Sequence, residues 1–282
     1  MQERTGHYAR RRAVNYLMIT ACGLATLLAI SILLMVIGYT LVQGLSYLNL
    51  EFITQTAKPL GEAGGGMRHE IIGTLVLVAI ATVIGVPVGM MAGIFLSEFG
   101  ENRVGMAVRL VADVLTGVPS IVTGIFVYVL VVRPMGTFSA LSGGIALAII
   151  MLPVVARTTE EMMRLVPVTY REAALALGIP RWRMIVSVVI PGALIGIVTG
   201  IMLSVARVAG ETAPLIFTAL GNVFGFSSLA EPIAALPLQI WRYAMSAYDT
   251  LHQQAWAASF LLVMVVLLIS LGVRWVTSRR YH

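Results

Sequence analysis

Two charged side chains close a long apolar run, where ionisable groups are rare. The run begins near Met184 and reaches Arg207, and Glu211 follows four positions later. Residues four apart on a helix share a face, so these two can form an ion pair. A helix rises about 1.5 Å per residue, which places Arg207 on the order of 35 Å from Met184, towards the far side of a membrane. Charges at that depth usually mark a transport path or an internal ion pair.

An arginine in such a position suits an oxyanion, because its planar guanidinium stays charged and donates two parallel hydrogen bonds. We expect Arg207 to line a path for an anion, with Glu211 either holding its geometry or keeping binding transient. A structural ion pair that locks two helices is the alternative. Asp113 and Arg157 are further candidates for the path. Asp113 also stands four residues after Arg109 and can pair with it, while Arg157 can simply extend to the cytoplasmic surface.

The sequence contains no recognisable catalytic or nucleotide-binding group. The glycine-rich stretch 61–66 lacks the Lys-Ser/Thr pair of a phosphate-binding P-loop, and no serine lies in a Gly-x-Ser-x-Gly elbow. The single cysteine, Cys22, excludes an intrachain disulfide. Metal-ligand spacing is absent among the histidines, which are His7, His69, His252 and His282. We therefore expect neither an enzyme nor a cofactor bound by this chain, and any energy source must be another chain.

Composition makes the lipid bilayer the main solvent of this chain. It is 59% hydrophobic and 11% charged, whereas soluble domains are about 25% charged. About 20 consecutive apolar residues cross a hydrocarbon core of about 30 Å. The first apolar run is too long for a signal peptide, so we interpret it as a retained anchor. The runs predict an all-α integral membrane protein of about six transmembrane helices, near residues 15–43, 70–97, 106–132, 139–157, 184–208 and 254–275.

The positive charges predict the orientation of these spans. Lys and Arg collect in the cytoplasmic loops of multi-pass proteins. Here they concentrate before residue 15, around 103–109, within 157–183 and from 274 onwards. Both termini are then cytoplasmic, as an even number of spans requires. This topology accounts for the net charge of +6 without a nucleic-acid partner.

Glycine and proline recur within the predicted spans. Small residues on one stripe let helix backbones approach closely, either within the chain or against a partner subunit. The prolines can kink a helix, more often as static bends than as parts of a gate. The glycine stripes are Gly85, Gly89, Gly93 and Gly192, Gly196, Gly200, and the prolines are Pro87, Pro119, Pro153 and Pro191.

The longest cytoplasmic segment predicts a short helix outside the membrane. Thr169, followed three residues later by Glu172, fits a capping box that starts a helix. Alanine and leucine continue it, Gly178 can close it in a left-handed conformation, and Pro180 prevents continuation. Its slim alanine face, surrounded by arginines, suits a knob that inserts into a protein groove. An interfacial helix on the lipid surface is the alternative.

This segment resembles the EAA signature of ABC importer permeases. The sequence Glu172-Ala173-Ala174 is followed at the family's spacing by Gly178 and by a Val-Val-Ile-Pro run that ends at Pro191. Valine and isoleucine there replace the usual isoleucine and leucine.

Further segments at 118–122, 157–160 and 206–214 are similar to the phosphate ABC transporter permeases of the PstA type. The similarity extends from about residue 65 to the end of the chain.

The resemblance implies a type I ABC importer permease fold in the bacterial plasma (inner) membrane. In that family the short helix sits in a cleft of the ATP-binding subunit and converts its closure into motion of the spans. The residues that we expect to couple to the ATPase are Thr169, Arg171, Glu172, Ala173, Ala174, Gly178 and Pro191. The residues that we expect along the substrate path are Arg207, Glu211, Thr212, Arg157 and Asp113.

The resemblance also implies inorganic phosphate as the cargo and a set of partners. These are a homologous second permease, a dimer of the ATP-binding subunit that uses ATP and Mg, an extracytoplasmic phosphate-binding protein and membrane lipid. An importer of another oxyanion, such as sulfate or molybdate, is one alternative. An ion-coupled secondary transporter is another, in which case the EAA match is accidental.

The expected organisation follows the chain in order. Residues 211–253 are too apolar for a solvated loop, and we expect them to fold back into or across the outer membrane face, where a binding protein would contact them and the 47–68 loop. The expected parts are a cytoplasmic tail at 1–14, an anchor at 15–44, an extracytoplasmic loop at 45–69, a permease core at 70–276 with the EAA loop at 158–183, and a cytoplasmic tail at 277–282.

Overall fold

The computed structural model describes residues 2–58, 64–222, 224–226 and 228–279. Helices dominate these residues. An isolated β-bridge pairs Leu220 with Ile233. The long helices are α1 (Gln2–Leu45), α3 (Arg68–Phe99), α4 (Arg103–Gly117), α7 (Ala140–Arg164), α10 (Ile190–Ala209) and α13 (Asp249–Arg279). The short ones are α2 (Leu50–Thr54), α5 (Ser120–Val127), α6 (Arg133–Met135), α8 (Val168–Ala176), α9 (Arg181–Met184), α11 (Ala213–Ile216) and α12 (Leu236–Ala244), with π-helical turns at Tyr128–Val132 and Ile185–Val189.

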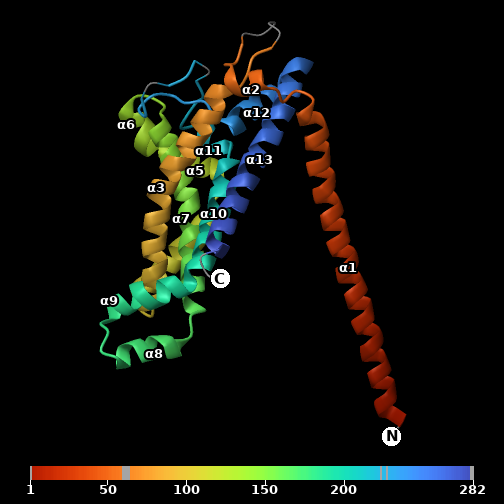
Figure 1. The fold of residues 1–282 in the computed structure, drawn as a ribbon, viewed down its shortest axis with the longest axis vertical. Helices are drawn as coiled ribbons and strands as arrows, with labels where there is room; N and C mark the ends of the chain where they lie inside the picture. The colour runs from red at the N-terminus through yellow and green to blue at the C-terminus, as the bar shows by residue number, and fades with distance from the viewer. Residues whose placement is uncertain (1, 59–63, 223, 227, 280–282) are drawn as a thin grey trace.

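The all-α membrane fold is confirmed. Among the described residues, five helices are long and apolar enough to cross a membrane, and a bent helix pair supplies a sixth span. Helices α3 and α7 run in parallel, because Gly85 faces Met151 whereas Gly93, further along α3, faces Ala156. The chain between them must therefore return across the membrane, which α4, α5 and α6 do (Figure 1). The start of α1 and the end of α13 lie in the same half of the molecule as α8 and α9.

The third span differs from the single helix expected at 106–132. The chain bends by 106° between Arg103–Gly117 and Ser120–Met135. A proline disfavours the helical conformation of the residue before it, and Val118 is extended, with ψ of 128°. Pro119 follows at the N-cap position of α5. The bend is therefore a direct consequence of this proline, whereas Pro87 and Pro153 lie inside continuous helices.

Both glycine stripes pack within the chain, and both pack against α7. A methyl group added at Gly93 would lie 2.5 Å from the carbonyl oxygen of Ala156, and one added at Gly200 would lie 2.6 Å from Cβ of Thr158. Gly93 belongs to α3 and Gly200 to α10. Helix α7 is thus held between two helices whose backbones approach it closely, as small residues permit in a membrane.

Helix α1 stands away from the rest of the bundle (Figure 1). It meets α13 near its outer end, where the ring centroids of Tyr39 and Trp256 lie 5.1 Å apart, edge to face, and where Gly44 lets Phe260 approach. Every side chain at 10–37 is exposed in this single chain. Such an apolar surface must face lipid or another subunit.

The segment after α10 covers the outer ends of the spans. The backbone nitrogen of Ser139 donates to the carbonyl of Thr218 at 3.0 Å, and that of Leu236 donates to Oγ1 of Thr74 at 2.8 Å. Residues 233–239 are buried. The apolar stretch therefore folds back onto the bundle, as expected.

Replacing Gly93 by alanine tests the packing of α3 on α7. The added methyl group would also lie 2.6 Å from Cβ of Thr159, so the two helices must separate, and overpacking of an interior usually costs about 1–3 kcal/mol. We expect Gly93→Ala to lower the midpoint of thermal unfolding of the detergent-solubilised protein. The control is Gly23→Ala, since nothing lies within 4 Å of that position. Equal midpoints for the two variants would contradict the close packing.

Candidate functional site

The cytoplasmic stub helix is present as α8, but it starts differently from the prediction. Pro167 occupies the N-cap position and no side chain caps the helix. The predicted capping box of Thr169 and Glu172 is therefore wrong. Because the fixed φ of Pro167 already suits a helix start, Thr169 lies inside the first turn. The end is as predicted, since Gly178 has φ of +78°, a left-handed conformation that favours glycine.

Helix α8 has one exposed face and one buried face. Tyr170, Glu172 and Ala173 are exposed, as is Leu177 directly after the helix, at 81%. Ala174, which was expected among the residues that couple to the ATPase, is buried in an apolar cluster beneath the helix and so does not face a partner directly. The exposed face is the part of α8 that another subunit can contact.

Pro191 shapes the entry of α10 into the membrane. It lies in the first turn of α10, directly after the π-helical turn Ile185–Val189. A proline cannot donate to the carbonyl four residues earlier, and a π turn takes up such a change of register. Pro191 therefore belongs to the span rather than to the exposed face of α8.

Arg171 points away from the exposed face of α8. One terminal nitrogen bonds to the carboxylate of Glu98, and the other donates to the carbonyl oxygen of Met163 at 2.7 Å. Glu98 lies in the last turn of α3 and Met163 in the last turn of α7, so Arg171 fastens α8 to two spans. Glu98 was missed in the sequence because it stands 73 residues from Arg171, beyond the reach of any local spacing.

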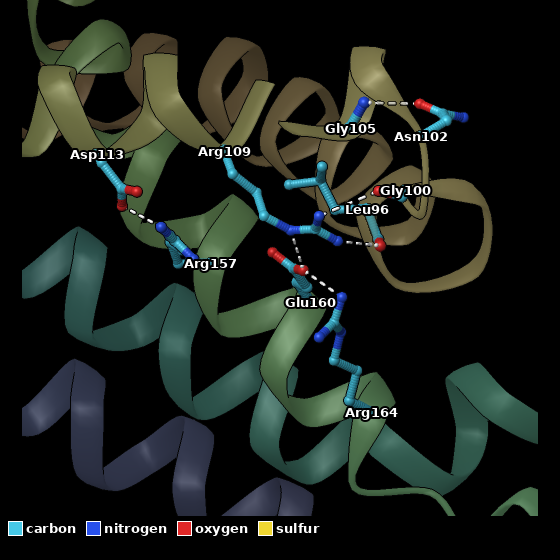
Figure 2. A network of polar contacts seen from close by, with 9 residues as sticks. All are labelled: Leu96, Gly100, Asn102, Gly105, Arg109, Asp113, Arg157, Glu160 and Arg164. Atoms are coloured by element: carbon cyan, nitrogen blue, oxygen red, sulfur yellow. Dashed lines mark hydrogen bonds and ion pairs between the residues drawn. The ribbon is translucent and has the colours of Figure 1, made fainter. Parts of the chain in front are cut away.

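A second group of polar contacts joins α3, α4 and α7 on the cytoplasmic side (Figure 2). Nε of Arg109 donates to Glu160 at 2.8 Å, and its terminal nitrogens donate to the carbonyls of Gly100 and Leu96, both at 3.0 Å. Arg164 contacts the same oxygen of Glu160 at 2.9 Å. The buried carboxylate therefore holds α4 onto α7, and Arg109 also satisfies free carbonyls at the end of α3.

The predicted pair of Arg109 and Asp113 is wrong, because Arg109 turns towards α3 and α7. Asp113 forms an ion pair with Arg157 instead (Figure 2). Arg157 is thus held by α4 and does not extend freely to the cytoplasmic surface. Both side chains stay accessible, with 57% of Asp113 and 34% of Arg157 exposed. Two of the candidate path residues are therefore brought together.

Arg207 and Glu211 line a cavity of about 160 Å³ at the bend between α4 and α5. Nε of Arg207 and Oε1 of Glu211 lie 4.0 Å apart, which is too far for a hydrogen bond. Helix α10 ends at Ala209. Contrary to the expectation, Arg207 and Glu211 therefore do not lie on one helix. The full lining is Leu115, Thr116, Val118, Pro119, Ser120, Ile150, Pro153, Val154, Arg207 and Glu211.

This cavity combines a cation with hydroxyl groups. Ser120 contributes a hydroxyl that can donate a hydrogen bond, and Arg207 supplies a charged donor, so the pair suits an oxyanion. The hydroxyl of Thr116 also lines the cavity, but it donates to the carbonyl of Ala112 at 2.9 Å. Sequence reasoning did not include Ser120 in the site, although it directly follows Pro119 at the bend. Thr212 lies outside the lining and donates to the carbonyl of Pro237 at 3.4 Å.

The helical architecture, the exposed stub and the polar cavity together define a membrane permease subunit. The sequence profile of the binding-protein-dependent transport system inner membrane components matches residues 85–280. The chain therefore belongs to this family, as a multi-pass protein of the bacterial inner membrane and a transport subunit rather than an enzyme. Partners follow in general terms from the family: an ATPase, a substrate-binding protein and a second permease.

Relatives match almost the whole chain. The phosphate transport system permease protein PstA of Yersinia pestis is 41% identical over 100% of this chain and 96% of its own. The PstA protein of Xylella fastidiosa (strain Temecula1) is 44% identical over 95% and 93%. A solved structure of the MetNI methionine ABC transporter, in inward-facing conformations, is 19% identical, with a TM-score of 0.61 over 77% of this chain and 98% of its own. The type I ABC importer permease fold is thereby confirmed.

Replacing Glu160 by glutamine tests the junction of α4 and α7. The variant keeps the size of the side chain but loses the charge that Arg109 and Arg164 share. Hydrogen bonds to charged groups contribute about 1.5–3 kcal/mol, so we expect Glu160→Gln to lower the midpoint of thermal unfolding. The neighbouring exposed residue Glu161 provides the control as Glu161→Gln, whose midpoint should match that of the wild type. A Glu160→Gln midpoint equal to that of the control would show that the junction does not depend on this charge.

Proposed function

We propose that this chain is the membrane-spanning permease subunit of an ATP-driven importer of inorganic phosphate, and that it couples closure of the ATPase to alternating access. The proposal rests on one observation: the chain is 41% and 44% identical, over almost its whole length, to two proteins named phosphate transport system permeases. The cavity that holds Arg207 supports the anionic cargo, because the guanidinium and the hydroxyl of Ser120 suit phosphate oxygens.

The weak contact between Arg207 and Glu211 supports passage rather than tight binding. A carboxylate at 4.0 Å offsets part of the arginine's charge without occupying its hydrogen-bond donors. An anion therefore finds free donors and leaves without a large barrier. In this proposal Asp113 and Arg157, one turn of α7 further towards the cytoplasm, form the next charged point on the path, and Thr212 supports the segment that carries Glu211.

The proposed complex contains a homologous second permease, two ATP-binding subunits and an extracytoplasmic phosphate-binding protein, surrounded by membrane lipid. ATP and Mg are used by the ATP-binding subunits, and neither a cofactor nor nucleic acid binds to this chain. The exposed face of α8 supports an ATPase contact, since Ala173 and Leu177 offer apolar surface outside the membrane. The exposed sides of α1 support contact with lipid or with the second permease.

Uptake of labelled phosphate tests the cargo and the role of Arg207. We expect the reconstituted complex to accumulate phosphate when ATP is supplied, with little competition from sulfate. Arg207→Gln should lower the uptake by about tenfold or more, because a lost charge-assisted hydrogen bond is worth about 1.5–3 kcal/mol. Arg133→Gln, at an exposed position outside the cavity, should transport normally. Unchanged uptake by an assembled Arg207→Gln complex would reject the path role, and equal competition by sulfate would reject phosphate selectivity.

Disulfide crosslinking tests the contact with the ATPase. In a Cys22→Ser background, Ala173→Cys should crosslink to a cysteine in the ATP-binding subunit, because Ala173 lies on the exposed face of α8. The matched control is Ala174→Cys, whose side chain points into the bundle with 6% exposed and should not crosslink. Crosslinks are read on denaturing gels from intact membranes. Failure of Ala173→Cys to crosslink at any partner position would exclude α8 as the docking helix.

A further inference from the structure

The cytoplasmic end of α3 receives arginines from three separate elements. Arg109 of α4 donates to the carbonyls of Leu96 and Gly100. Arg171 of α8 pairs with the carboxylate of Glu98. Arg181 of α9 donates to the carbonyl of Glu98, and its guanidinium lies over the ring of Phe99, 4.5 Å from the centroid. Cations stabilise the negative end of a helix dipole, so this end of α3 is a point where three elements are tied together.

Glu98 is the buried acid at this point. Only 3% of its side chain is exposed, against 16% of the side chain of Arg171. A buried ion pair adds little net stability, but it fixes geometry, and removal of one partner leaves an uncompensated charge. The planar fork of Arg171 also reaches Met163, so the pair sets the position of α8 relative to α3 and α7 together.

Apart from the ion pair, α8 contributes one small buried side chain to the bundle, and Tyr170 borders a cavity that α7 and α10 also line. Ala174 supplies the buried apolar side chain of the helix, and an alanine offers little contact area. Short linkers connect α8 to α7 and to α9. Without the ion pair, a movement of the ATPase would tilt α8 while α3 stayed in place.

Helix α3 is well placed to carry a displacement to the cavity. Its glycine stripe packs against α7 from Gly85 to Gly93. Helix α7 in turn contributes Ile150, Pro153 and Val154 to the cavity that holds Arg207. A movement of α3 therefore reaches the cavity wall through one closely packed interface.

We propose that Glu98 is the positioning residue that, through Arg171, ties α8 to α3 and thereby converts movement of the ATPase into movement of the spans. This inference rests on the proposed import function. Arg171 accordingly acts on the inner side of α8, while Ala173 and its exposed neighbours meet the ATPase. The role of Glu98 is mechanical and does not involve contact with the cargo.

The test compares ATP hydrolysis with phosphate uptake in the reconstituted complex. The variants are Glu98→Gln, Arg171→Gln and the double variant, with Glu101→Gln as the control, because Glu101 is an exposed acid just beyond α3. Coupling between sites typically changes an equilibrium by about 5- to 150-fold. We expect the ATP consumed per phosphate imported to rise about fivefold or more in each single variant and no further in the double variant. Co-purification of the ATP-binding subunit verifies assembly.

A purely structural role predicts a different result. ATP hydrolysis and uptake would then fall in parallel, with an unchanged ratio, and that result would overturn the proposal. Arg171→Lys serves as a milder variant if Glu98→Gln does not assemble. Its single nitrogen keeps a charge but cannot bridge Glu98 and Met163 in the same way, so a raised ratio is again expected, and a wild-type ratio would count against the bridge.

A distance measurement gives an answer independent of the cargo. Spin labels at Glu101→Cys and Thr169→Cys, both exposed, report the distance from the end of α3 to α8 in a Cys22→Ser background. We expect the same distance with and without trapped nucleotide in the wild type, and a nucleotide-dependent distance in Glu98→Gln. A distance that changes equally in both would overturn the proposal. Absence of phosphate uptake by a wild type whose distances behave as expected would reject the cargo instead.

Discussion

The close approach of three helix backbones is the constraint on which the rest of the structure depends. Lipid supplies no hydrophobic drive between spans, so helices associate where small residues allow extensive contact. Helix α7 receives such contact on two sides, from Gly85, Gly89 and Gly93 of α3 and from Gly196 and Gly200 of α10. This central position gives α7 its part in the cavity wall and places Arg157 and Glu160 towards α4.

Arg109 and Arg171 lie in a different kind of environment from Arg207. At the cytoplasmic ends of the spans, Arg109 and Arg171 each combine a carboxylate with backbone carbonyls. These hydrogen bonds hold helices together. Arg207 differs, because 55% of its side chain is exposed and the contact with Glu211 is 4.0 Å long. An arginine held so loosely beside a cavity is available to a ligand, whereas Arg109 and Arg171 already bond to other parts of the chain.

Sequence reasoning succeeded where the controlling interaction is local or compositional. Apolar length gave the spans, and a glycine after a short helical run gave the left-handed end at Gly178. It failed at Thr169, because the proline two residues earlier had already started the helix. It also predicted the third span as one helix with Pro119 as a residue that can kink it, whereas the chain bends by 106° there, although the effect of Pro119 on Val118 is itself local.

In the candidate site, the sequence mainly failed to predict which residues form ion pairs. The pairing of Arg109 with Asp113 followed from spacing along one helix, but the real partners come from other spans, 51 residues away for Arg109 and 44 for Asp113. Glu98 escaped notice for the same reason. Which side chains converge is decided by how α3, α4, α7 and α8 pack, and no single-helix pattern contains that information.

The isolation of α1 bears on how the protein is made. Its side chains at 10–37 are exposed in this chain, so over this length its helical state depends mainly on lipid and on its own backbone hydrogen bonds. It can therefore enter the bilayer before α3 and the helices that follow α3 in the chain have been made. Those helices then assemble beside α1, and the contact of Tyr39 with Trp256 forms only after α13 has been inserted.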